Sequence, residues 1–111
     1  MILFVGPLYS GKTECAEAYW KGKGLDPAAC RIRSDAQILA KGCRTAEHLR
    51  AVADQLAVFD VVLFTEVGSG LVPVDPEERA FRENAGRLSI LLAERADEVY
   101  RVVCGLPTRL K

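Results

Sequence analysis

The chain has 111 residues, half of them hydrophobic, which suffices for one domain with a modest core. Fifteen lysines and arginines balance fifteen aspartates and glutamates, so charge gives no argument for nucleic acid or an anionic membrane as a partner. We therefore expect a single domain over residues 1–111 that binds neither, and a net charge near zero favours a homo-oligomer.

Other sequence features point to a protein of the cytoplasm. Met1 leads straight into an apolar segment without the basic region of a signal peptide, and no apolar run reaches membrane-spanning length. The four cysteines lack the C-x-x-C spacing of zinc sites. We expect no zinc, and we expect buried free thiols at Cys15, Cys30, Cys43 and Cys104.

A glycine-rich segment follows the apolar residues 2–5 and precedes a segment of helical character, residues 13–21. The octapeptide fits G-x-x-x-x-G-K-[ST], and the order of strand, glycine loop and helix is the context typical of a P-loop. The alternative is an ordinary glycine-rich turn. The nucleotide-binding residues predicted from this match are Gly6, Pro7, Leu8, Tyr9, Ser10, Gly11, Lys12 and Thr13.

These residue types suit phosphate binding. Gly6 and Gly11 permit a close backbone approach, so that loop amides and the helix N-terminus can meet anionic oxygens. Lys12 supplies positive charge to the β- and γ-phosphates of ATP or GTP, and Thr13 offers a hydroxyl to Mg²⁺. Pro7 removes one amide from the loop, which predicts fewer phosphate contacts than usual.

Periodicity and end signals predict alternating elements along the rest of the chain. Thr45 is the expected N-cap of one helix, and Asp75 followed by Pro76 begins another. The expected helices are 13–21, 45–57 and 76–96, and the expected strands are 2–5, a weak edge strand at 30–34, 59–64, 99–104 and a short edge strand at 108–110. This α/β alternation implies a mostly parallel sheet of four or five strands with helices on both faces.

Apolar stripes predict which helix faces are buried. In helix 45–57 the stripe consists of Leu49, Val52, Ala53 and Leu56, and in helix 76–96 it consists of Phe81, Ala85, Leu88, Leu92 and Ala96, widened by Ile90 and Leu91.

Two further residues are candidates for catalysis. His48 lies beside the first stripe, so a solvated or flanking histidine is the alternative to a catalytic one. Glu66 follows strand 59–64, and ligands gather at the carboxyl ends of such strands. Its alternative is a solvated loop carboxylate.

Several blocks resemble the adenosylcobinamide kinase/adenosylcobinamide-phosphate guanylyltransferase family. Besides the P-loop, they are residues 66–73 (EVGSGLVP), 81–88 (FRENAGRL), 92–99 (LAERADEV) and 102–111 (VVCGLPTRLK). The resemblance implies a three-layer, RecA-like P-loop fold and a cytoplasmic enzyme of cobalamin synthesis, typically a trimer. It implies a kinase that phosphorylates adenosylcobinamide and then transfers GMP from GTP through a histidine.

The resemblance also assigns residues. Gly6, Ser10, Gly11, Lys12 and Thr13 match the family's phosphate loop, and Glu66 matches the glutamate of its E-V-G motif. The family's histidine-bearing helix has no counterpart, because only residues 40–43 stand in its place and His48 lies beyond. Its separate acidic strand is also missing, so Asp35 or Glu66 would stand in beside Mg²⁺, and Ser89 replaces an asparagine.

Three hypotheses follow from this pattern. The first is a compact kinase acting on a corrinoid, with the guanylyl transfer weak or absent because that step needs a covalent nucleophile. The second is a paralogue that binds nucleotide without turnover and regulates or scaffolds a partner. The third is a small P-loop kinase for another hydroxyl substrate.

Overall fold

The computed structural model describes residues 1–67 and 75–111, and for Pro27 the backbone alone. The expected extended linker at 71–74 and the greater part of the 66–73 block lie outside these residues.

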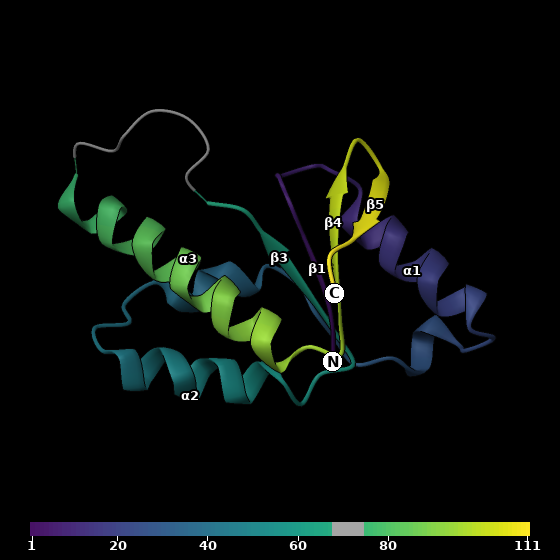
Figure 1. Ribbon diagram of the computed structural model, residues 1–111, viewed down its shortest axis with the longest axis horizontal. Coiled ribbons are helices and arrows are strands. Elements are labelled where there is room, and N and C mark those ends of the chain that lie inside the picture. The colour runs from purple at the N-terminus through teal and green to yellow at the C-terminus, as the bar shows by residue number, and fades with distance from the viewer. Residues whose placement is uncertain (68–74) are drawn as a thin grey trace.

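A five-stranded sheet with the order β2-β3-β1-β4-β5 forms the centre of the molecule (Figure 1). The first four strands are parallel, and β5 is antiparallel to β4. Their bounds are β1 Ile2–Gly6, β2 Ile32–Arg33, β3 Val61–Thr65, β4 Glu98–Val103 and β5 Leu106–Arg109. The expected edge strand at 30–34 is thus reduced to two residues, and the terminal strand begins two residues earlier than predicted.

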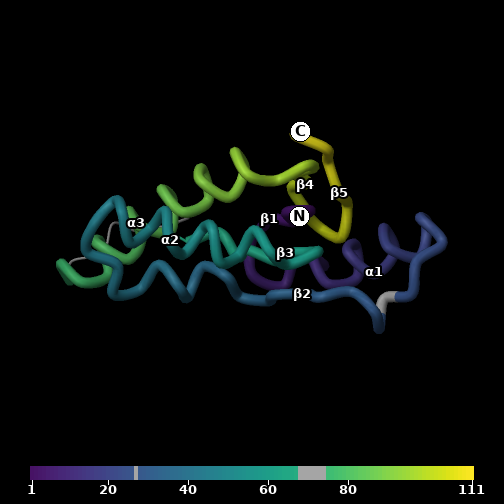
Figure 2. Tube along the Cα trace, turned by 90° about the horizontal axis from the view of Figure 1, so that it is seen from below, coloured from purple at the N-terminus to yellow at the C-terminus, as the bar shows by residue number. Residues whose placement is uncertain are grey.

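Helices cover both faces of the sheet. Helix α1 (Lys12–Gly22) lies on one side, and α2 (Ala46–Leu56) and α3 (Pro76–Arg95) lie on the other, as Figures 1 and 2 show from two directions. Two short 3₁₀ helices, η1 (Pro27–Ala29) and η2 (Ala36–Ala40), complete the regular structure of the described residues. The predicted three-layer α/β architecture of a RecA-like P-loop fold is confirmed.

Alternation along the strands produces two separate cores. Leu3, Val62 and Phe64 face α2 and α3 in the larger core. The alternate residues of β1 and β3 face α1 in the smaller core, together with one residue of α1 and one of β4. The members of this core are Ile2, Phe4, Ala16, Val61, Leu63 and Val102. A side chain at the end of β3 therefore reaches one core layer or the other according to its position in the strand.

The helix predictions hold in their caps and in most of their faces. The Thr45 Oγ1 accepts the His48 N–H at 3.0 Å, and the Asp75 Oδ1 accepts the Glu77 N–H at 3.0 Å. All four residues of the α2 stripe are buried. Ile90, however, is 61% exposed rather than part of the α3 stripe, because it lies about 200° around the helix from buried Leu88.

The four cysteines are free as predicted, but only Cys43 is fully buried. Cys43 is buried and Cys15 and Cys30 are half-buried, whereas Cys104 is exposed because it lies in the tight β4–β5 turn with φ of 52°. Among the residues that the structure describes, no three acidic, histidine or cysteine side chains are grouped to hold a metal ion. None of the helices in that part of the chain combines the length and apolar character that crossing a bilayer demands.

Candidate phosphate-binding site

The glycine loop connects the end of β1 to the start of α1 at the carboxyl edge of the sheet. An added Cβ on Gly6 would lie 2.3 Å from the Val102 carbonyl oxygen, so no larger residue fits without movement. Gly11 caps α1 with φ of 90°, in the left-handed region that favours glycine. The local structure thus requires both glycines of the predicted motif.

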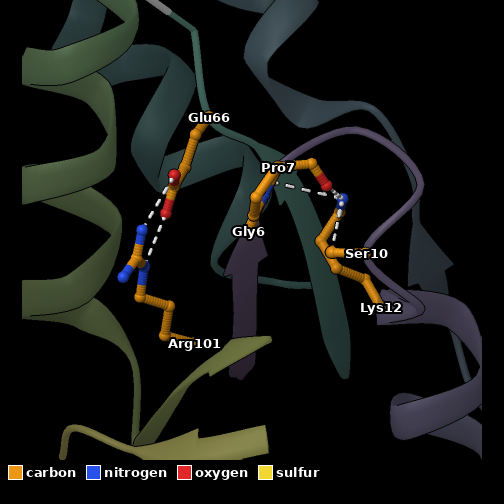
Figure 3. Close-up of polar contacts among 6 residues, drawn as sticks. All are labelled: Gly6, Pro7, Ser10, Lys12, Glu66 and Arg101. Carbon is orange, nitrogen blue, oxygen red and sulfur yellow. Dashed lines mark hydrogen bonds and ion pairs between the residues drawn. The ribbon is translucent and has the colours of Figure 1, made fainter. Parts of the chain in front are cut away.

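Lys12 is folded back into this loop (Figure 3). Its ammonium donates to the Pro7 carbonyl at 2.7 Å and lies 3.4 Å from both the Gly6 carbonyl and the Ser10 Oγ. Only 9% of the residue is exposed. Burial lowers the pKa of Lys12, while the nearby charges of Asp35 and Glu66 act in the opposite direction. The positive charge therefore lies inside the bend, where a phosphate would meet it.

A cavity of about 520 Å³ opens beside the loop, which is a volume typical of small-molecule sites. Residues of the loop and of the first turn of α1 form one wall, and two other segments complete the lining. Its residues are Leu8, Tyr9, Ser10, Gly11, Lys12, Thr13, Glu14, Ser34, Asp35, Leu63 and Thr65. The predicted residues 8–13 therefore share one cavity, and Gly6 and Pro7 adjoin it through Lys12.

The lining of this cavity includes two carboxylates, Glu14 in the first turn of α1 and Asp35 after strand β2. The Asp35 φ of 51° is unusual for a residue other than glycine, and strained backbone of this kind is often retained at functional sites. The following 3₁₀ helix is tied to the sheet because the Gln37 Oε1 accepts the Thr65 N–H at 3.0 Å. The structure therefore brings Asp35 together with Lys12 and Thr13.

Glu66 is close to the loop through its backbone but not through its side chain. Its N–H donates to the Gly6 carbonyl at 2.9 Å. Its carboxylate instead accepts from Arg101, at 3.0 Å from Nε and 3.4 Å from Nη2, and faces a cavity of about 170 Å³ lined also by Ala85 and Ser89 of α3. Figure 3 shows it pointing away from Lys12. The pairing raises the pKa of Arg101.

His48 is not part of the loop cavity. It lies exposed on α2, the helix packed against the opposite face of the sheet from α1. The structure places this histidine in the flanking position that the sequence allowed.

Sequence reasoning did not single out Ser34 and Thr65, although both line the loop cavity. Thr65 ends the buried strand β3, and a polar residue at the carboxyl end of a parallel strand is a signal that could have identified it. Ser34 had no such signal, because its position depends on the path of the chain after the two-residue strand β2.

Similarity to a known protein family covers most of the chain beyond the glycine loop. The sequence model of the family described as cobinamide kinase / cobinamide phosphate guanyltransferase matches residues 33–110. This match begins after the glycine loop, so the assignment of the loop depends on its motif and geometry.

Two curated relatives are similar over shorter stretches. The bifunctional adenosylcobalamin biosynthesis protein CobU of Salmonella typhimurium is 40% identical over 72 residues, which cover 56% of this chain and 40% of that protein. The protein of the same name from Escherichia coli is 48% identical over 52 residues, covering 46% of this chain and 29% of its own length. The matches thus span less than half of either relative.

Proposed function

The chain belongs to the cobinamide kinase / cobinamide phosphate guanyltransferase family, and from this premise we propose that it is a kinase of cobalamin biosynthesis. The proposed reaction transfers the γ-phosphate of ATP or GTP to the hydroxyl of an adenosylcobinamide. The observation that carries the proposal is the position of Lys12, buried inside a glycine loop that borders a cavity of about 520 Å³. Cytoplasmic location and assembly into a homo-oligomer, a trimer by resemblance, belong to the same proposal.

The chain's own contribution is positioning and charge neutralisation. The loop amides and the α1 N-terminus bind the phosphate oxygens, and Lys12 exchanges its contact with the Pro7 carbonyl for one with the β- and γ-phosphates. The acceptor hydroxyl oxygen forms a bond to the γ-phosphorus, the bond between that phosphorus and the β,γ-bridging oxygen breaks, and the hydroxyl proton is released to solvent. The nucleoside diphosphate departs with that bridging oxygen.

Two residues fit a role beside Mg²⁺. Thr13 and Asp35 line the same cavity as Lys12, and hydroxyl and carboxylate oxygens are ligands that Mg²⁺ accepts alongside nucleotide phosphates and water. When bound, the ion would neutralise developing charge on the phosphate oxygens. Glu66 would join this site or the acceptor only by exchanging its ion pair with Arg101.

A kinase assay tests the proposal directly. Adenosylcobinamide, Mg²⁺ and either ATP or GTP are incubated with the protein, and the corrinoid is separated by chromatography, with a full-length bifunctional relative as positive control. We expect phosphorylated corrinoid with at least one nucleotide. Its absence with both nucleotides, while the control reacts, would reject the kinase.

We further propose that guanylyl transfer is weak or absent, because His48 lies on α2, away from the loop cavity. Incubation with GTP labelled at the α-phosphate should leave no acid-labile label on the protein. Label that disappears in His48→Gln would contradict this and assign the nucleophile.

The second candidate is a paralogue that binds nucleotide without turnover. The observation favouring it is that Arg101 engages Glu66, the E-V-G glutamate, on the far side of β3. Calorimetry with GTP and Mg²⁺ beside the kinase assay separates the candidates: binding without phosphorylated product supports the paralogue, and turnover supports the enzyme.

A further inference from the structure

The turn between β4 and β5 is packed against the back of the glycine loop. The Gly105 N–H donates to the Ser10 carbonyl at 2.7 Å, and the Gly105 carbonyl accepts from the Cys15 Sγ of α1 at 3.4 Å. An added Cβ on Gly11 would lie only 3.1 Å from the Gly105 Cα. The turn is therefore held to both sides of the junction between the loop and α1.

The hydrogen bond to Ser10 has a consequence for the next amide. In a trans peptide the carbonyl oxygen and the following N–H point in opposite directions, and the described chain has no cis peptide bond. Because Gly105 holds the Ser10 carbonyl toward the turn, the Gly11 N–H is directed away from it. Ser10 and Gly11 both line the loop cavity, whereas Gly105 does not.

We propose that Gly105 is a positioning residue of the phosphate site: by fixing the Ser10 carbonyl, it orients the Gly11 N–H toward a phosphate oxygen of the bound nucleoside triphosphate. The proposal rests on nucleotide binding by the loop. Pro7 leaves the loop one amide short, so the orientation of each remaining donor carries more of the affinity. Fixing it before binding avoids an ordering cost when phosphate arrives.

Two glycine substitutions provide a matched first test. Gly105 has φ of 72° and Gly24 has φ of 73°, and an added Cβ would meet nothing within 4 Å at either position. Gly105→Ala and Gly24→Ala therefore introduce the same backbone strain, and both should lower the Tm similarly. We expect only Gly105→Ala to weaken binding of Mg²⁺ complexes of ATP, GTP and inorganic tripolyphosphate.

A backbone ester removes the proposed bond alone. Cys104 permits native chemical ligation of residues 1–103 to a synthetic peptide of residues 104–111 in which glycolic acid replaces Gly105. An all-amide ligation product is the reference. The control is an ester at Leu110, which removes that residue's N–H bond to the Val99 carbonyl, 2.8 Å long and away from the loop.

We expect the Gly105 ester to weaken all three phosphate probes by about tenfold at a temperature where every protein is folded, since one oriented donor is lost. The Leu110 ester should bind as the all-amide protein does. The Gly11 amide resonance should shift on adding tripolyphosphate to the all-amide protein, and much less in the Gly105 ester.

The outcomes separate this inference from the proposed function. Equal affinities for the Gly105 ester and the all-amide protein, or equal losses in both esters, would overturn the positioning role while leaving nucleotide binding intact. Failure of the all-amide protein to bind any of the three probes would overturn nucleotide binding by the loop and the positioning role together.

Discussion

Arg101 holds the carboxylate of Glu66, with 3.0 Å between Nε and Oε1, on the side of the sheet that α3 covers. Asp35 instead shares a cavity with Lys12 and Thr13. The two carboxylates that the sequence offered for Mg²⁺ thus line different cavities, and different effects are expected on neutralising each of them.

Neutralising each carboxylate tests which one serves the metal. Asp35→Asn should weaken Mg²⁺-dependent nucleotide binding by about tenfold, because a charged oxygen is lost from the cavity. Glu66→Gln should leave affinity nearly unchanged and cost at most about 1 kcal/mol of stability, since the Arg101 pair is partly solvated. Calorimetric titrations with and without Mg²⁺ measure both. The reverse order of effects would assign the metal role to Glu66.

Lys12→Ala should abolish the main charge contact of the loop. We expect nucleotide affinity to fall by about 2–3 kcal/mol, as for a lost charge-assisted hydrogen bond. Stability should change little, because burial already disfavours the Lys12 charge and lowers its pKa. Lys21→Ala, an exposed substitution in the same helix, is the matched control for calorimetry and thermal unfolding. Similar affinities in the two variants would argue against the site.

Gly6→Ala and Gly86→Ala should have opposite effects on stability. A Cβ on Gly6 would meet the Val102 carbonyl oxygen at 2.3 Å, so backbone must shift at a cost of about 1–3 kcal/mol. At Gly86, inside α3, a Cβ meets nothing within 4 Å, and alanine should stabilise the helix by about 0.5–1 kcal/mol. Urea unfolding of both variants measures the difference. A Gly6→Ala protein as stable as the parent would contradict the close packing of β4 behind the loop.

The contact between α1 and β4 predicts two pH limits of stability. The Glu98 carboxylate accepts hydrogen bonds from the hydroxyls of Tyr19 and Tyr100, which lowers the pKa of Glu98. Its contribution is present above the usual pKa of 4.5 and is lost as pH falls through the lowered value. Burial and Glu98 raise the pKa of Tyr19 from 10.0 to about 12, so its contribution is present below pH 10 and is lost between pH 10 and 12.

When the free energy of unfolding is measured against pH, Tyr19→Phe should therefore reduce the loss of stability at alkaline pH. It should also reduce the loss of stability at acid pH. Tyr9→Phe is the control, because Tyr9 is 95% exposed. An alkaline limb that Tyr19→Phe leaves unchanged would show that another group causes it.

Sequence patterns that act over a few residues predicted many features of this protein. A continuous apolar, β-branched run predicted the buried strand β3, and period-3.6 patterns predicted the stripes of α2 and α3. The Thr45 and Asp75 caps set where those helices begin. The glycine loop was predicted for the same reason, since its conformational requirements are met within a few residues. Ile90 was misassigned because a helix stripe read from sequence has no fixed edge until a neighbour packs against it.

The sequence by itself determined the order of elements and the position of the glycine loop, because propensity, capping and hydrophobic periodicity act between near neighbours. Only the tertiary structure decided that Asp35 shares a cavity with Lys12, that Glu66 pairs with Arg101, and that the Gly105 turn contacts the loop. These contacts join distant segments, so they depend on strand order and on where each strand ends. A shift of one residue at the end of β3 would exchange the faces of Thr65 and Glu66.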